Sequence, residues 1–225
     1  MGVFDVMGMV IPYKELVDRV CKELDIKNSD LILDAGSGTG TLALEIKKRG
    51  GKVVGIDSSQ AAIKIHKKKD MSAEIIFADL TKPFLFEDNY FDRVVCMLTL
   101  HSIKIADRQT LINEFYRVLK PGGKIVLANP CSGFNPSRIF WDHLRKDLKK
   151  SGIMKVLFDT VVKVGYMIKM FYYNIMIERE NKKGEYGILG INEQTLLLKK
   201  SGFKNLSETE VLYAKSAILN SAYKK

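Results

Sequence analysis

Residues 33–40, with the sequence LDAGSGTG, constrain the fold more than any other part of this chain of 225 residues. They overlap a short apolar run at 31–35 and lead into a helical pattern at 39–48. Glycine at every second position lets the backbone turn tightly and lets a ligand lie directly against it. A strand, a glycine loop and a helix in this order predict the first unit of a nucleotide-binding α/β sheet.

The alternation of strand and helix continues up to Pro130. An amphipathic helix is predicted at 14–25, ahead of the first strand. The further predicted elements are strands at 53–56, 74–78, 92–98 and 124–129 and helices at 59–69 and 108–119. Short connections between alternating strands and helices predict a parallel sheet with helices on both faces.

After Pro130 the pattern changes to helices followed by two short closing strands. The predicted helices are 137–150, a long apolar stretch at 154–179, and 193–201, and the predicted strands are 203–209 and 213–219. With 46% hydrophobic and 28% charged residues, the composition excludes a disordered chain. We therefore expect one domain over 1–225, divided into an N-terminal helical cap at 1–25, a cofactor-binding core at 26–136, a helical cap and substrate lid at 137–190, and a closing helix with strands at 191–225.

An acidic residue at the tip of the second predicted strand indicates a nucleoside cofactor. This residue is Asp57 in VVGIDSS, 17 positions after Gly40. A carboxylate there can accept hydrogen bonds from ribose hydroxyls, because nucleotides bind at the carboxyl ends of the strands. A dinucleotide fingerprint has the spacing GxGxxG, whereas this loop has GxGxG.

Five segments resemble the class I S-adenosylmethionine-dependent methyltransferases, most closely the small-molecule branch, methyltransferase type 11, that includes quinone-biosynthesis enzymes. They are LDAGSGTG, GIDSS, ADL at 78–80, PFLFEDNYFDRVVCMLTLHSI at 83–103 and EFYRVLKPGGKIVLANP at 114–130. The resemblance covers about residues 25–130. It implies a Rossmann-like, doubly wound, seven-stranded and mostly parallel sheet with strand order 3-2-1-4-5-7-6 and an antiparallel last strand. It also implies S-adenosyl-L-methionine as cofactor and S-adenosyl-L-homocysteine as product.

The resemblance further implies which residues bind the cofactor. They are Asp34, Ala35, Gly36, Ser37, Gly38, Gly40, Asp57, Ser58, Asp79, Leu80, Leu98 and Thr99. The glycine loop would hold the methionine end, Asp57 the ribose hydroxyls and Asp79 the adenine amino group. Leu80 would line the adenine, while Leu98 and Thr99 would lie near the reactive methyl. Ser58 departs from the family, which often has an apolar residue there. The alternative is that the carboxylates only cap helices or turns.

Two residues are candidates for the reaction itself. His101 follows the fourth predicted strand, where an imidazole could act as general base or position the acceptor; alternatively it caps the following segment. Tyr13 could close over the cofactor or pack in the core. We expect His66 on the solvated surface and His143 on a helix face, and three scattered histidines predict no metal site.

The C-terminal part carries most of the excess positive charge. The chain has a net charge of +10, of which residues 131–225, with 17 basic and 9 acidic residues, contribute +8. Within this part, residues 152–179 combine a charged arc with a broad Met-rich and aromatic face. Three interpretations remain open: a core helix, a lid whose Tyr166, Met170 and Tyr173 line an acceptor pocket, or a basic segment on an anionic bilayer.

The sequence predicts methyl transfer to O, N or C of a small apolar or aromatic acceptor. The rivals are an RNA or protein methyltransferase that grips its substrate with the basic C-terminal half, and a non-catalytic cofactor-binding protein. Nucleic acid is the less favoured partner, since the basic residues are mostly Lys. Scattered cysteines, with neither a signal peptide nor a transmembrane pattern, predict a cytoplasmic protein, with peripheral contact to the inner membrane face as an option. No oligomeric state is predicted.

Overall fold

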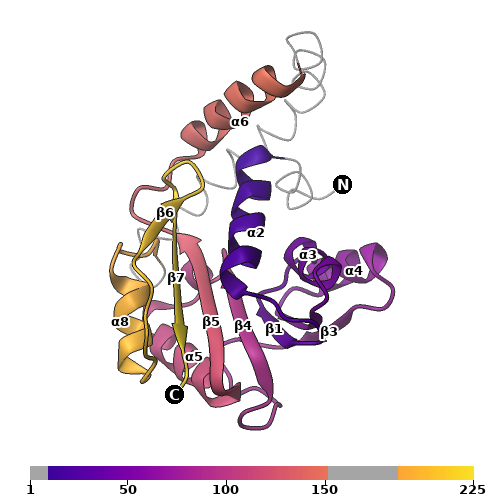
Figure 1. The fold of residues 1–225 in the computed structure, drawn as a ribbon, viewed down its shortest axis with the longest axis vertical. Coiled ribbons are helices and arrows are strands. Elements are labelled where there is room, and N and C mark those ends of the chain that lie inside the picture. Colours follow the sequence, from indigo (N-terminus) through magenta and orange to yellow (C-terminus); the bar gives the residue numbers. More distant parts are fainter. Residues whose placement is uncertain (1–9, 152–186) are drawn as a thin grey trace.

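The computed structural model describes residues 10–151 and 187–225 (Figure 1). The predicted helix at 154–179 lies outside the described residues. So do three of the predicted acceptor-pocket residues, Tyr166, Met170 and Tyr173.

Seven strands form one sheet with the order β3-β2-β1-β4-β5-β7-β6. They are β1 Leu31–Ala35, β2 Lys52–Asp57, β3 Glu74–Phe77, β4 Phe91–Met97, β5 Leu119–Pro130, β6 Glu210–Leu212 and β7 Ala217–Tyr223. The strands from β3 to β5 pair in parallel, while β7 is antiparallel to both β5 and β6. The predicted order and the antiparallel last strand are therefore confirmed.

Helices cover both faces of this sheet. They are α2 Ile11–Leu24, α3 Thr41–Lys48, α4 Gln60–Lys69, the 3-10 turn η1 Leu100–Ser102, α5 Ile105–Val118, α6 Pro136–Ser151 and α8 Glu193–Lys200. In Figure 1, α2 lies along the sheet and α8 lies beside β7. Ser59 shows why α4 begins where it does, because its side chain caps the free amide of Ala62.

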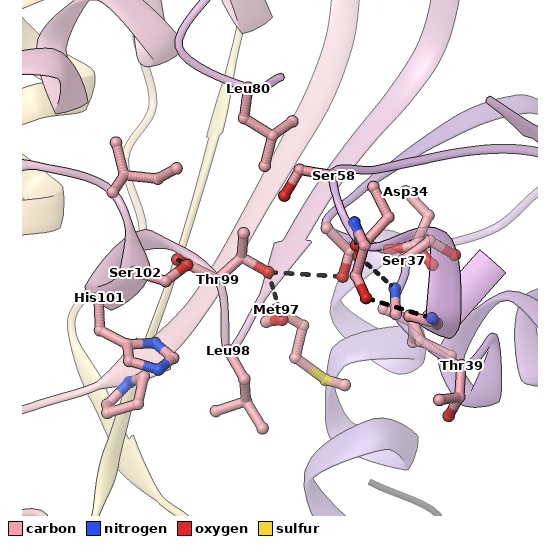
Figure 2. Close-up of a pocket in the computed structure, with 18 of the residues that line it drawn as sticks. Asp34, Ser37, Thr39, Ser58, Leu80, Met97, Leu98, Thr99, His101 and Ser102 are labelled. Carbon is pink, nitrogen blue, oxygen red and sulfur yellow. Dashed lines mark hydrogen bonds between the residues drawn. The ribbon is translucent and has the colours of Figure 1, made fainter. Parts of the chain in front are cut away.

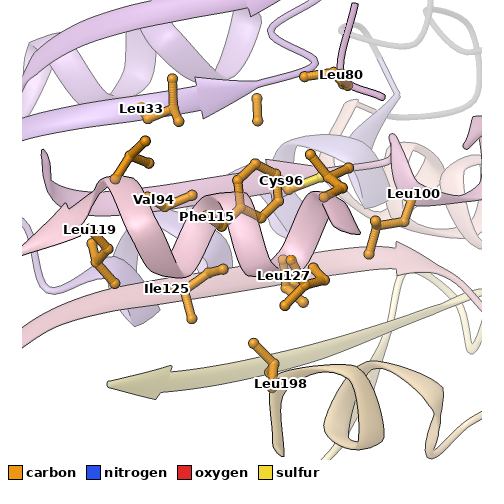
Figure 3. Packing of buried hydrophobic residues seen from close by; sticks show 14 of the residues in the cluster. Leu33, Leu80, Val94, Cys96, Leu100, Phe115, Leu119, Ile125, Leu127 and Leu198 are labelled. Atoms are coloured by element: carbon orange, nitrogen blue, oxygen red, sulfur yellow. The ribbon is translucent and has the colours of Figure 1, made fainter. Parts of the chain in front are cut away.

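Neighbouring strand residues supply two separate cores, because successive side chains of a strand point to opposite faces. One core joins α2 and α3 to residues such as Ile32, Val95 and Val126. The other joins α5 and α8 to Leu33, Val94 and Leu127 (Figure 3). Strands buried on both faces read as continuous apolar runs, and this is why the sequence predicted them well.

The two closing strands were predicted at wrong positions. Strand β6 begins at Glu210 and β7 at Ala217, whereas Phe203 is a buried residue that packs edge-on against Tyr116 with ring centroids 4.9 Å apart. Between the strands the chain makes a left-handed turn, defined here as residues 213–215, with φ values of 55°, 54° and 60°. None of these residues is glycine, so the sequence contains no local pattern that predicts a left-handed turn here. The fifth predicted strand also starts earlier, at Leu119, and has an irregularity near its beginning.

Candidate active site

A cavity of about 710 Å³ lies at the carboxyl ends of β1, β2 and β4. Ten of the predicted cofactor-binding residues line it, namely Asp34, Gly36, Ser37, Gly38, Asp57, Ser58, Asp79, Leu80, Leu98 and Thr99. The predicted residues Tyr13 and His101 also line it. Of the remaining two, Ala35 is fully buried and Gly40 is the N-cap residue that precedes α3. Figure 2 shows Thr99 between the glycine loop on one side and His101 with Ser102 on the other.

The glycine loop is tied to β2 and touches the tip of β4. The amides of Gly36 and Ser37 both donate to the carbonyl of Ile56, at 2.8 and 3.1 Å. Gly36 has a φ of +78°, and a Cβ there would come within 2.2 Å of Thr99 Oγ1, so a side chain would separate the two segments. At Gly38 a Cβ would meet only the Gly36 carbonyl, at 4.0 Å, so this side of the loop is open.

Two carboxylates line the cavity near the ends of β2 and β3, and each is held by neighbouring donors. Asp57 accepts from the amide of Gly38 at 2.8 Å and from that of Ser59 at 2.7 Å, through different oxygens. Asp79 accepts from both the amide and the hydroxyl of Thr81, which hold its pKa below its usual range. Each oxygen of Asp57 has a second lone pair, whereas both bonds to Asp79 use Oδ1 and leave the lone pairs of Oδ2 for a ligand. Capping the loop and accepting hydroxyl or amino hydrogens are therefore compatible roles.

Asp34 differs from these two carboxylates because it is buried. It is 2% exposed, and its Oδ2 has no hydrogen-bond partner within residues 10–151 and 187–225. Burial raises its pKa from 3.8 to about 7, and the charge of Asp57 adds to this shift. A buried carboxyl with a vacant acceptor suits a cationic or hydrogen-donating ligand group.

The segment after β4 carries His101 in an irregular turn. Leu98 has a φ of 53°, and the hydroxyl of Thr99 donates to the carbonyl of Met97 at 3.0 Å. The Nδ1 atom of His101 is buried and has no hydrogen-bond partner in the described part of the chain. Burial, together with the charge of Arg108, lowers the pKa of His101 to about 4. The imidazole is therefore neutral near pH 7.

Three aromatic residues line one end of the cavity, and only one of them was predicted from the sequence. Tyr13 lies there, and burial plus the charge of Asp34 raise its pKa to about 12. Phe134 and Tyr213, which the sequence did not single out, line the same cavity. Tyr213 is 8% exposed and comes from the left-handed turn. Tyr213 is far from the motifs in sequence, and only the fold brings it to the site, whereas Phe134 follows the last motif by four residues.

Two other expectations meet the structure differently. His66 was predicted to lie on the solvated surface, but the structure buries it to 2% exposure. Its Nδ1 lies 3.4 Å from Ser37 Oγ, and its ring lies against Gly40. Its spacing of four residues from the buried Ala62 is the signal that could have placed it on the inner face of α4. His143 lies on α6 and accepts weakly from the amide of Ile11. Among the described residues no cluster of His, Cys, Asp and Glu could hold a metal ion.

The fold, with its glycine loop at the carboxyl end of β1, is similar to that of solved S-adenosylmethionine-dependent methyltransferases. More particularly, residues 33–127 match a family model described as a methyltransferase domain. The chain is similar to the demethylmenaquinone methyltransferase of Streptomyces avermitilis, with 34% identity over 110 residues that cover 49% of this chain and 46% of the relative. The enzyme of the same name from Staphylococcus saprophyticus is 32% identical over 134 residues, which cover 56% of each chain. The chain thus spans about half the length of the curated relatives it matches.

Solved structures share this fold at low sequence identity. The PH0226 protein of Pyrococcus horikoshii has a TM-score of 0.64 at 19% identity and covers 95% of this chain and 91% of its own. Haemonchus contortus phosphoethanolamine N-methyltransferase 2, solved in complex with S-adenosyl-L-methionine, has a TM-score of 0.61 at 17% identity and covers 93% and 52%. These similarities concern the fold alone.

S-adenosylmethionine is the cofactor of this class, and the residues around the cavity fit it. The vacant oxygen of Asp34 suits the ammonium group of the methionine end, and the open side of the loop at Gly38 leaves room for a ligand. The spare lone pairs of Asp57 suit ribose hydroxyls.

Proposed function

We propose that this chain transfers a methyl group from S-adenosylmethionine to a small aromatic acceptor of the quinol type. The observation that carries the proposal is one continuous cavity that joins the cofactor motif to the aromatic end formed by Tyr13, Phe134 and Tyr213. The names of the similar demethylmenaquinone methyltransferases support a quinol acceptor. Aromatic side chains suit a flat apolar ring.

The bound cofactor would supply a methyl group on a sulfonium, which a nucleophile can attack in line. Much of the rate can then come from holding the acceptor in place and excluding water. In this role the neutral His101 accepts a hydrogen bond from an acceptor hydroxyl at its unprotonated ring nitrogen. A pKa of about 4 favours this positioning role over that of a strong base.

We also propose that the basic C-terminal part makes peripheral contact with an anionic membrane, where a lipid-soluble acceptor would be found. None of the helices in the described part of the chain is long and apolar enough to span a membrane. Helix α6 instead has an exposed face with Trp141, 62% exposed, and Leu148, 39% exposed. Arg145 and Lys149 are exposed beside them at helical spacing. Aromatic and aliphatic residues flanked by cations are typical of interfacial helices.

The test is methyl transfer from radiolabelled S-adenosylmethionine to a short-chain 2-prenyl-1,4-naphthoquinol. Wild-type protein should transfer the label, and Asp57→Ala should abolish both cofactor binding and transfer while the fold remains intact. Asp70→Ala is the matched control, since Asp70 pairs with Lys47 outside the cavity. Cofactor binding without transfer would refute the quinol acceptor. Unchanged cofactor affinity in Asp57→Ala would refute the assignment of the site. Salt-dependent binding and labelling of RNA instead would favour the RNA methyltransferase.

A further inference from the structure

Buried side chains hold the turn that carries His101 from two sides. On the first side, Asn129 of β5 is fully buried, and its Oδ1 accepts from the amides of Thr99 at 2.8 Å and Leu100 at 2.9 Å. Asn129 therefore fixes two of the three residues that lie between β4 and His101.

The orientation of Asn129 is in turn set by a fully buried residue of α8. Gln194 Oε1 accepts from Asn129 Nδ2 at 2.9 Å, and Gln194 Nε2 donates to Asn220 Oδ1 at 3.0 Å. Asn220 Nδ2 in turn donates to the hydroxyl of Thr209 at 2.9 Å. In this arrangement every donor faces an acceptor. If the amide of Asn129 were rotated by 180°, its NH2 group would face the backbone amides of Thr99 and Leu100, which are also donors.

On the second side, Arg108 of α5 holds the carbonyl groups of the same turn. It is 1% exposed, and its Nε donates to the carbonyls of Leu100 at 3.1 Å and Ile103 at 3.3 Å. Its Nη1 pairs with Glu193 at 2.6 Å, and the second oxygen of Glu193 accepts from the amide of Gly190. Leu100 is thus fixed through both its amide and its carbonyl, by partners that lead to consecutive residues of α8.

The placement of these polar groups favours a role beyond stability. Buried charged and polar networks contribute little net stability compared with apolar packing. Here two networks converge on one irregular turn at the cavity and both start at the first residues of α8. The contacts satisfy buried backbone groups of the turn, and this turn is the one that carries His101 into the cavity.

We propose that Gln194 and Glu193 are positioning residues that set the place of Thr99, Leu100 and His101 against the acceptor. They act through Asn129 and Arg108, respectively, and touch neither cofactor nor acceptor themselves. The inference rests on the proposed methyl transfer for its kinetic part only. It predicts that losing these contacts impairs transfer to the acceptor and spares cofactor binding.

The first measurement is steady-state transfer to 2-prenyl-1,4-naphthoquinol by Gln194→Met, which keeps the volume and removes the hydrogen bonds. We expect kcat to fall by about 10- to 100-fold, because small misplacements of reacting groups are costly. The Kd of S-adenosylhomocysteine should stay within about threefold of wild type in calorimetry, a change of about 0.7 kcal/mol. Gln109→Met is the matched control, since Gln109 joins α5 to the other end of α8 through Leu197 and Ser201. It should lower Tm without lowering kcat.

The second measurement needs no acceptor. Amide hydrogen exchange at Thr99 and Leu100 should be about tenfold faster in Gln194→Met than in wild type, with the Gly38 amide as the internal reference. Gln109→Met should leave this ratio unchanged. Equal exchange ratios in the two variants would overturn the inference. If wild-type protein transferred no methyl to the quinol, the acceptor would be wrong and exchange would still decide the inference.

A gentler variant covers the case in which Gln194→Met does not fold. Glu193→Gln keeps the side chain but removes the negative charge that Arg108 faces. Like Gln194→Met, it should lower kcat, and it should speed amide hydrogen exchange at Leu100 more than at Gly38. Loss of cofactor binding in parallel with kcat would overturn the positioning role, since it would show a general effect on the fold.

Discussion

At the scale of single residues, the carboxyl of Asp34 combines burial with an unsatisfied oxygen. Such a group costs free energy unless it is protonated or meets a partner. Its pKa of about 7 places this cost within the range of ordinary buffers. Asp34 therefore makes the stability of the free protein depend on pH in a way that the exposed carboxylates do not.

We expect Asp34→Asn to remove a loss of stability between about pH 4 and about pH 7. In this range the folded wild type keeps a proton that the unfolded chain has released, so its free energy of unfolding falls as the pH rises. The difference in free energy of unfolding between Asp34→Asn and wild type should be more favourable to the variant at pH 8 than at pH 4, by up to about 4 kcal/mol. This value corresponds to a pKa difference of about three units between the folded and unfolded states. Urea unfolding at both pH values measures this. Asp79→Asn should show no such gain, because the pKa of Asp79 is lowered; an unchanged slope in Asp34→Asn would contradict the prediction.

We expect His101→Phe to reduce kcat by about 100-fold, because the acceptor loses its hydrogen-bond partner while the volume is kept. Cofactor binding should stay near that of wild type in calorimetry. His143→Gln, which changes a histidine on α6, should leave kcat close to wild type. Since the pKa of His101 is about 4, the wild-type kcat should not fall between pH 8 and pH 6 through its protonation. A fall in that range that disappears in His101→Phe would contradict this.

The sequence predicted which residues line the cavity at the strand tips better than which residues line its aromatic end. Gly36, Gly38 and Asp57 lie in segments whose spacing alone brings them to the strand tips, and the cavity lining includes them. Tyr213 reaches the cavity, and Gln194 the network behind it, only through pairing of distant strands and packing of α8. Such contacts leave no periodicity in the sequence, so they could not be predicted from it.

At the scale of elements, the left-handed turn is the most unusual local structure. Tyr213, Ala214 and Lys215 each adopt a conformation that costs an L-residue about 1–2 kcal/mol. Ser216 stabilises the turn, since its amide bonds to the carbonyls of Leu212 at 3.0 Å and Tyr213 at 3.1 Å. The sequence instead favoured a strand at 213–219, because Tyr213 and Ile218 are of residue types with high β propensity. Tertiary packing of Tyr213 decided against this local preference.

We expect Lys215→Gly to raise the free energy of unfolding by about 1 kcal/mol, because glycine adopts positive φ without steric cost. Lys215 is exposed, so little packing is lost. The matched control is Lys64→Gly, at an exposed position within the right-handed helix α4, which should lose about 1 kcal/mol. Urea unfolding measures both. Equal losses in the two variants would show that the turn is not strained.

At the scale of the whole molecule, charge and cofactor chemistry lie in different parts of the chain. Residues 131–225 hold +8 of the net charge of +10, whereas the methyltransferase match covers residues 33–127. The strand order was predictable because residues 33–127 resemble a known family of methyltransferase domains, and the order follows from that resemblance. The role of the charge was not, because composition does not tell a lipid surface from a polynucleotide.

We expect the protein to sediment with vesicles rich in phosphatidylserine and to dissociate as salt rises, because screening weakens contacts of about 1 kcal/mol per cation. Arg145→Glu with Lys149→Glu should weaken binding by about tenfold or more. Lys67→Glu with Lys68→Glu makes the same charge change on α4 and should weaken it far less. Equal losses in the two double variants would remove the role of α6, and no sedimentation at low salt would refute membrane contact.

The place of β7 inside the sheet sets the order in which the parts of the cavity can form during synthesis. This strand lies between β5 and β6 and carries Asn220, and Ser221 donates to Glu23 of α2 at 2.7 Å. Until residues 217–223 have left the ribosome, β5 lacks its neighbour and the amides behind the His101 turn lack their support. A nascent chain could therefore form the cofactor motif early, but it would acquire an ordered acceptor side only after its last strand had been inserted.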